Sequence, residues 1–265
     1  MNLTDLFPDG EHRFQLNLRR GEPREFFTRR DDTGLILAER KRWLDADPER
    51  YALLGPAGEP LLREFLEMAD KWTTLGAGGA EGSLGIREAG ALIEPDLLFL
   101  SPDETGEFRL SGGALCFPSG WALEEKIGHT LDFIHGVVPG LNPALASPIR
   151  QFMGRMKPGL AYLRDNWGLA GTDELNLHPS RRIPAPALPA DLRKIWLRVE
   201  NQALMALPSG RGVVFGIRIA LHRLEELAGS VAGAGLRRAL ASMPPELAAY
   251  KRIEKIRDAV MVLLG

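Results

Sequence analysis

The sequence predicts an α+β protein in which an antiparallel sheet carries helices on one side. Stretches typical of strands lie on both sides of a helical block, and a Gly- and Pro-containing junction joins the last two of them. The chain then ends in an amphipathic helical pattern. Strands gathered in this way, rather than alternating singly with helices, are typical of antiparallel sheets. A chain of 265 residues, 45% hydrophobic and 26% charged, is long enough to bury a large core.

The first helix is expected directly after Pro60, where apolar residues recur at spacings of three and four (Leu61, Leu62, Phe65, Leu66, Ala69 and Trp72). The Gly-rich stretch 76–85 should end it as a loop, and it lacks the spacing of a phosphate-binding loop. Residues 1–50 are polar. Their basic residues alternate with acidic ones, which favours a solvated face of mixed charge (Arg19, Arg20, Arg24, Arg29, Arg30, Arg40, Lys41 and Arg42 with Glu22, Glu25, Asp31, Asp32 and Glu39).

Strands are expected at 93–100 and 108–117, on either side of a turn-rich segment. Helices are expected at 121–134 and 148–164. The proline-rich stretch 176–193 predicts an irregular surface loop or crossover.

Two further strands, 195–207 and 213–220, should form an antiparallel hairpin through the junction 208–212. A C-terminal helix should begin at the proline pair 244–245. Its core-facing stripe is formed by Leu247, Tyr250, Ile253, Ile256, Val260 and Leu263.

Several classes of function are disfavoured. A formal net charge of −2 provides no bulk attraction for nucleic acid or an anionic membrane. No apolar run approaches the length of a membrane span, and the acidic N-terminus does not resemble a signal peptide, so a cytoplasmic protein is expected. The motifs of zinc proteases, α/β-hydrolases and P-loop proteins do not occur in the sequence. Cys116 is the single cysteine, and its apolar surroundings predict a buried hydrophobe rather than a nucleophile.

Among the five histidines, His135 stands in the most apolar setting, within Phe133–Pro139. A neutral imidazole in an apolar wall is what an axial haem ligand requires, and Gly136 would leave space beside it. The alternative is a buried histidine whose ring is satisfied by a backbone carbonyl. The residue pattern by itself favours this second interpretation.

A second candidate group follows in the strand 195–207. Arg198, Glu200 and Gln202 are spaced two apart, so their side chains share one face of the strand, while Leu197 and Val199 share the other. A face bearing Arg, Glu and Gln is either exposed to solvent or must be paired and line a pocket.

At these residues the sequence resembles the haem-dependent oxidative N-demethylase-like family, which includes the catalytic subunit of a dimethylamine monooxygenase. The matching elements occur in family order over residues 94–251. They are Glu94-Pro95-Asp96-Leu97, Phe117-Pro118-Ser119-Gly120-Trp121, Lys126-Ile127-Gly128, Ile134-His135-Gly136-Val137-Val138-Pro139, Arg164-Asp165-Asn166-Trp167, the series Arg198, Glu200, Gln202, Leu204, Leu207 and Pro208, and Tyr250-Lys251. Four positions depart from the family pattern: Glu94, Pro95, Asn201 and Ala203.

The resemblance implies a PAS-like antiparallel sheet that holds haem under its helices, with N- and C-terminal helical extensions. The whole chain, 1–265, would form one domain, divided into an N-terminal extension (1–90), a PAS-like core (91–220) and C-terminal helices (221–265). His135 would be the axial ligand of the haem iron, which reverses the preference for the backbone-satisfied alternative. Arg198 and Glu200 would face the haem, the arginine polarising bound dioxygen and the glutamate holding a cationic amine.

The resemblance also implies an enzyme, a haem-dependent monooxygenase that oxidises the methyl group of a small amine to formaldehyde. Haem would supply the oxygen chemistry, and a separate reductase subunit would supply electrons. Two other functions remain open: a haem-binding PAS-like sensor or binding domain without turnover, and a structural domain that has lost the cofactor.

Overall fold

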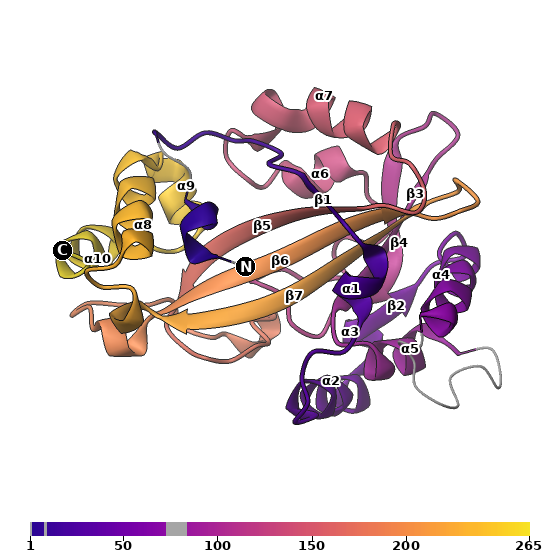
Figure 1. The fold of residues 1–265 in the computed structure, drawn as a ribbon, viewed down its shortest axis with the longest axis horizontal. Coiled ribbons are helices and arrows are strands. Elements are labelled where there is room, and N and C mark those ends of the chain that lie inside the picture. Colours follow the sequence, from indigo (N-terminus) through magenta and orange to yellow (C-terminus); the bar gives the residue numbers. More distant parts are fainter. Residues whose placement is uncertain (1, 8–9, 73–83) are drawn as a thin grey trace.

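The protein is described here by a computed structural model that covers residues 2–7, 10–72 and 84–265. Within these ranges the centre is a seven-stranded sheet in the order β1-β5-β6-β7-β3-β4-β2, with every neighbouring pair antiparallel (Figure 1). Its strands are β1 (Arg19–Gly21), β2 (Ala52–Leu54), β3 (Asp96–Pro102), β4 (Phe108–Ala114), β5 (Ala161–Ala170), β6 (Trp196–Ala206) and β7 (Val213–Arg223). The predicted α+β class is confirmed.

The hairpin of β6 and β7 is the longest paired unit and forms as the sequence predicts. The pairing runs without interruption from Trp196 opposite Arg223 to Ala206 opposite Val213. Leu207 then donates its N–H to the carbonyl of Gly212 at 3.0 Å, which closes the connection. The predicted strands β3 and β4 are also present. The stretch 176–193 is irregular as predicted, apart from two short 3₁₀ turns at Pro179–Arg181 and Leu192–Lys194.

The segment between β4 and β6 differs from the prediction. The expected helix at 121–134 is a series of turns up to Thr130, followed by the short helix α6 (Leu131–His135). The expected helix at 148–164 is displaced, since α7 spans Leu141–Met153 and β5 begins at Ala161. Gly159, with φ +84°, turns the chain between them.

The predicted C-terminal helix is likewise interrupted. The structure has α8 (Val231–Ser242), α9 (Pro245–Tyr250) and α10 (Arg257–Leu263) in its place. Arg252 adopts φ +58° and ends α9, with Ile253 donating its N–H to the carbonyl of Ala248, as in a helix stop with a left-handed residue. Four of the six predicted inward residues are nevertheless buried: Leu247, Ile253, Ile256 and Val260. The prediction is wrong for Tyr250 and Leu263, which are 45% and 44% exposed, because the breaks between the helices turn them away from the core.

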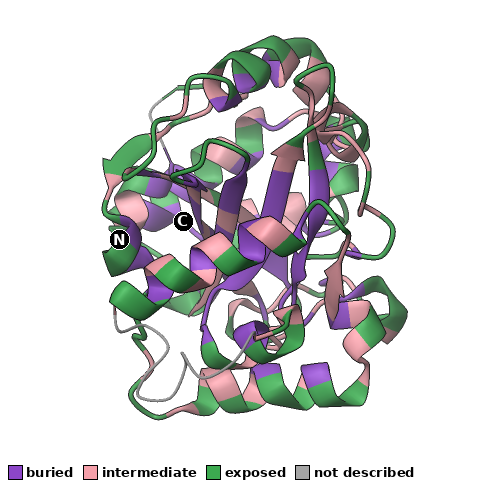
Figure 2. Ribbon diagram, turned by 90° about the vertical axis from the view of Figure 1, so that its right-hand side faces the viewer, coloured by how far each residue is buried: buried purple, intermediate pink, exposed green. Residues whose placement is uncertain are grey.

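Helices cover both faces of the sheet. On one face α8, α9 and α10 pack at one end, while α1 (Pro23–Phe27), α4 (Glu59–Lys71) and α5 (Ile86–Leu92) pack at the other (Figure 1). On the second face, here called the α7 face, α6 and α7 contact side chains such as Leu204 and Ile217. Figure 2 shows the consequence, a buried sheet between helices whose outer surfaces are exposed. Helices therefore lie on both sides and not on one side alone.

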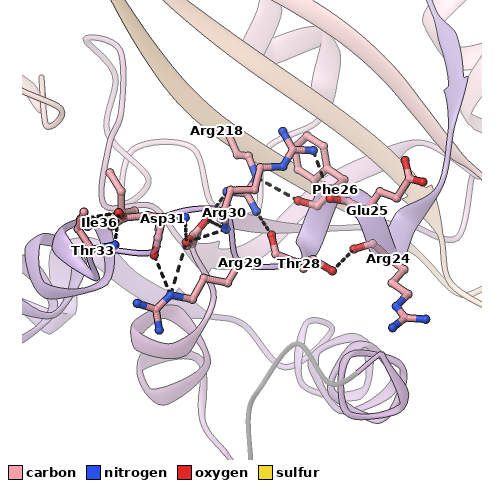
Figure 3. A network of polar contacts seen from close by, with 11 residues as sticks. Arg24, Glu25, Phe26, Thr28, Arg29, Arg30, Asp31, Thr33, Ile36 and Arg218 are labelled. Atoms are coloured by element: carbon pink, nitrogen blue, oxygen red, sulfur yellow. Dashed lines mark hydrogen bonds and ion pairs between the residues drawn. The ribbon is translucent and has the colours of Figure 1, made fainter.

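The first ninety residues belong to the sheet as well as to its helical cover. They supply its two edge strands, β1 and β2, together with α2 (Leu35–Ala46) and α3 (Pro48–Tyr51). The segment after α1 is anchored by Arg218 of β7, which donates to the carbonyls of Phe26 and Thr28 at 3.0 and 2.6 Å (Figure 3). Arg218 also forms an ion pair with Glu94, which accepts the N–H groups of Arg30 and Asp31.

Three sequence expectations concern other parts of the chain. Cys116 is buried as predicted, and burial raises the pKa of its thiol to about 12. Arg40 departs from the expected solvated face, because it is completely buried. Most of the Gly-rich stretch 76–85 lies outside the described residues. Across the described ranges, no helix is both long enough and apolar enough to cross a membrane.

Candidate functional site

Polar side chains are concentrated on the α7 face of two neighbouring strands. Pairing places Arg164 opposite Gln202, Asn166 opposite Glu200, and Gly168 opposite Arg198. Because side chains alternate along a strand, these six residues share one face with Leu204, which packs in the cluster under α6 and α7. The predicted common face of Arg198, Glu200 and Gln202 is therefore the face that α6 covers.

All three predicted residues of β6 are buried, with exposed fractions of 3% for Arg198 and 8% for both Glu200 and Gln202. Desolvation lowers the pKa of Arg198 to about 10, although Glu200 and Asp96 oppose that change. Arg198 and Glu200 are thus within electrostatic reach of each other. The solvent-exposed interpretation of this face does not apply.

Arg198 directs its guanidinium at two loops. Its Nε donates to the hydroxyl of Ser119 at 2.8 Å, and its Nη2 donates to the carbonyls of Phe117 and Leu175 at 2.9 and 2.7 Å. Its Nη1 donates to the carbonyl of Glu174 at 3.3 Å. The arginine therefore ties the segment after β4 to the segment after β5, and each guanidinium nitrogen already has a protein acceptor.

Glu200 is held by amides and not by a direct ion pair with Arg198. Its Oε2 accepts the side-chain N–H of Gln202 at 2.7 Å and that of Asn166 at 3.2 Å. Both donors come from the same sheet face, so the carboxylate is fixed in position by its own strand and the next one. Its other oxygen, Oε1, has no hydrogen-bond partner among the described residues and is not sealed from solvent.

The sheet face beside Glu200 is open. Asn166 is exposed although it lies in the middle of β5, and a Cβ built on Gly168 would meet no atom within 4 Å. We call this space the β5 opening and define it by Asn166 and Gly168. A separate pocket of about 20 Å³ lies near the start of α6, between Leu131 and Met153, and its lining does not include His135 or Glu200.

His135 is the last residue of α6, whose orientation is set by several contacts. The hydroxyl of Thr130 caps the helix by accepting the N–H of Phe133 at 3.2 Å, and Asn142 donates to the carbonyl of Asp132 at 2.7 Å. Ile134 packs into the cluster on the α7 face. These contacts fix the helix that carries the imidazole against the sheet.

The imidazole of His135 is half-buried and makes no hydrogen bond to any described residue. The backbone-satisfied alternative therefore does not apply here. Desolvation lowers its pKa, and the charge of Arg164 lowers it further, while Asp132 opposes both. The ring is consequently neutral at neutral pH, which is the form that coordinates a metal.

The other histidines have different surroundings. His178 contacts Ser180 and Glu124 through its two ring nitrogens, and the ring of His129 stacks on Phe133 at 3.9 Å. Within the described ranges no three His, Cys, Asp or Glu side chains group as a metal site. As an iron ligand, His135 would thus stand alone, and the iron would have to be held by a further group such as a porphyrin.

Three residues of the site were part of the sequence resemblance without any predicted role: Arg164, Asn166 and Lys251. Lys251 follows α9 and donates its Nζ to the carbonyl of Trp167 on β5 at 2.6 Å. Desolvation and Arg164 lower the pKa of Lys251, whereas Glu200 raises it. The motifs around these residues were visible in the sequence, but their proximity to Glu200 depends on the pairing of β5 with β6.

The described residues are compatible with haem in four respects. A neutral, unpartnered imidazole lies on a helix that faces the sheet, and an open space lies over Gly168. Half-buried apolar side chains such as Ile219 and Val138 lie in the adjoining clusters. Arg164 has a buried Nε without a hydrogen-bond partner among these residues, and this N–H is a donor for a negatively charged group of the ligand. Among the described residues, the site therefore combines a candidate iron ligand, apolar contacts and a cation without an acceptor.

Comparison with known families agrees with this chemistry. A family model described as haem-dependent oxidative N-demethylase, alpha subunit-like, matches residues 78–261. The match covers more than half of the chain and includes β3 to β7 and the helices α6 to α9. The chain belongs to this haem-dependent family.

Proposed function

We propose that this chain is the haem-binding, amine-oxidising component of an oxidative N-demethylase. The observation that carries the proposal is His135, a neutral imidazole without a hydrogen-bond partner among the described residues, on a helix packed against the sheet face that presents Glu200. The antiparallel order β4-β3-β7-β6-β5, with α6 and α7 on one face, supports a PAS-like description of the core.

His135 would hold the iron through its free ring nitrogen, and the haem would lie over the α7 face of β5 and β6. When bound, haem would supply the activation of dioxygen. The protein residues provide position and polarity. Glu200, fixed by Asn166 and Gln202, would accept a hydrogen bond from the amine nitrogen through its accessible Oε1 and so place an N-methyl group toward the iron.

The overall reaction would require a separate electron donor. One oxygen atom of dioxygen enters formaldehyde, and the other leaves as water after uptake of two electrons and two protons. The N–CH₃ bond is broken, and the nitrogen gains one hydrogen in place of the methyl carbon. A reductase subunit would supply the two electrons, and the substrate would be a small methylated amine.

Arg198 has a different place in this proposal from the one the sequence suggested. Its donors contact Ser119 and loop carbonyls and are not free to bind dioxygen directly. Its positive charge would therefore stabilise bound dioxygen from a distance, and its hydrogen bonds would hold the two loops in position. This same observation favours the second candidate function, a haem-binding sensor or binding domain without turnover.

Two measurements separate the possibilities. Purified protein reconstituted with haem should show a Soret band and release formaldehyde from dimethylamine when NADPH and a reductase are added. A Soret band without formaldehyde release would favour the binding domain. Absence of any Soret band after reconstitution would reject both haem functions.

A further inference from the structure

Arg164 is a cation without an acceptor in the part of the chain that the structure describes. Its Nε is buried and has no hydrogen-bond partner, and its guanidinium makes no hydrogen bond or ion pair to any described residue. Asp165, the next residue, points to the other face of β5 and pairs with Arg19. The side chain is half-buried, but a buried Nε with no acceptor is unfavourable, because the hydration of that N–H has been removed and not replaced.

The surroundings of Arg164 carry an excess of positive charge. Glu200 acts electrostatically on three cationic side chains, which are Arg164, Arg198 and Lys251. Arg198 and Lys251 donate to backbone carbonyls, which are neutral. Asp96 and Asp165 also act on Arg198 and Arg164, but these two carboxylates are already paired with Arg40 and Arg19. Positive charge is therefore in excess, and a ligand that is purely cationic would increase the imbalance.

We infer that Arg164 binds a carboxylate group of the molecule that occupies the β5 opening. A guanidinium presents a planar set of donors that matches the two oxygens of a carboxylate, and such a pair is charge-assisted. Arg164 lies within electrostatic reach of both His135 and Glu200, so a bound carboxylate would lie close to the iron ligand and the amine acceptor.

Two molecules could supply this carboxylate, and both follow from the proposed function, on which this inference rests. One is the haem, through a propionate. The other is the substrate, which would then be an N-methylated amino acid whose ammonium group contacts Glu200 and whose carboxylate contacts Arg164. The chemistry at Arg164 is the same in both cases.

The first arm compares haemin with haemin dimethyl ester, in which both propionates are esterified, in titrations followed at the Soret band. If Arg164 binds a propionate, the unmodified protein should bind haemin about 10- to 100-fold more tightly than the ester, the range expected for a charge-assisted hydrogen bond. Arg164→Gln should reduce this preference several-fold, and Arg164→Lys should retain part of it. Arg155→Gln, at an exposed arginine after α7, controls for the loss of one positive charge.

The second arm uses the haem-loaded protein and the Soret shift caused by N-methylglycine or dimethylamine. If Arg164 binds the substrate carboxylate, Arg164→Gln should weaken binding of N-methylglycine about 10- to 100-fold and leave haemin and dimethylamine affinity unchanged. Equal affinities of Arg164→Gln and the unmodified protein for haemin, the ester and N-methylglycine would overturn the inference.

A third arm separates this inference from the proposed function. If the unmodified protein binds no haem, the proposed function is rejected. Calorimetry on the haem-free protein then compares the binding of benzoate, a carboxylate, with that of benzamide, its neutral counterpart. Binding of benzoate alone, lost in Arg164→Gln, supports the carboxylate site. Absence of benzoate binding, or equal binding by the variant, rejects it. Thermal unfolding checks the fold, since the haem-free Arg164→Gln protein should be at least as stable as the unmodified one.

Discussion

Arg40 of α2 and Asp96 of β3 form a completely buried ion pair, with Nη1 of the arginine 2.6 Å from Oδ1 of the aspartate. The carboxylate also accepts the N–H groups of Cys116 and Phe117 at 2.7 and 3.1 Å. Burial raises the pKa of Asp96, and Arg40 with these N–H groups opposes that change. The pair joins the N-terminal region to the segment that Arg198 contacts through the carbonyl of Phe117.

Breaking this pair on one side should strongly destabilise the protein. Asp96→Ala leaves the guanidinium of Arg40 buried without its counter-charge, and we expect a loss of about 3–5 kcal/mol in the free energy of unfolding. Urea denaturation of Asp96→Ala, Arg40→Met and the double variant measures the coupling. The double variant should lose less than the two single losses combined. A loss below about 1 kcal/mol for Asp96→Ala would contradict the buried pair.

Arg198→Met should destabilise the protein, because it removes hydrogen bonds from Ser119 and from carbonyls of two loops. Hydrogen bonds to charged groups predict a loss of about 2–4 kcal/mol in the free energy of unfolding. Arg193→Met serves as the control, since Arg193 is exposed and pairs only with nearby Asp191 among described residues. Unchanged stability together with faster decay of the oxygen adduct would instead indicate a direct role at the haem.

His135→Ala should abolish haem retention and leave the fold intact, because the ring makes no hydrogen bond within the described protein. Loss of a residue that supports a metal ligand typically lowers metal affinity roughly 10- to 100-fold, and loss of the ligand itself should lower haem affinity by at least this factor. Soret absorbance after reconstitution measures retention, and circular dichroism measures folding. His129→Ala and His178→Ala are the matched variants. The assignment is wrong if either of these loses the Soret band while His135→Ala retains it.

Haem affinity should be nearly independent of pH from about 8 down to about 6.5, the ordinary pKa of histidine. Desolvation and Arg164 hold the pKa of His135 below that value in the folded protein, so protons compete for the ring only at lower pH. By linkage, the folded protein binds fewer protons at this site than the unfolded chain, and stability falls as the pH drops below about 6.5. A decline in haem affinity that begins above pH 7 would show that the pKa of the ligand is not lowered.

Glu200→Gln should weaken amine binding and leave haem content unchanged. The substitution preserves an acceptor for one amide of Asn166 or Gln202 but removes the negative charge that faces the β5 opening. We expect amine affinity to fall by about 10-fold or more, as for the loss of a charge-assisted hydrogen bond. Soret shifts on addition of amine measure affinity, and haem content is the internal control.

Residue patterns alone predicted the hairpin of β6 and β7, the helix after Pro60 and the burial of Cys116, because each depends on neighbours in the sequence. They also predicted the shared face of Arg198, Glu200 and Gln202, since alternation along a strand is a local property. The setting of His135 marked it as a candidate ligand, and the family resemblance decided between its two interpretations. These features required no knowledge of which segments meet.

Only the tertiary structure decided the rest. The strand β5 has no clear apolar alternation, because Asp165 interrupts the face that carries Leu163 and Trp167. Its pattern therefore does not indicate a strand. Arg40 lies in a run of charged residues, and its burial follows from meeting Asp96, 56 positions away. The proximity of Arg164 to His135 and Glu200 likewise depends on how β5 pairs and where α6 packs. Contacts between distant residues leave no period in the sequence, and the polar contacts of Glu200 with Asn166 and of Arg198 with Ser119 are of this kind.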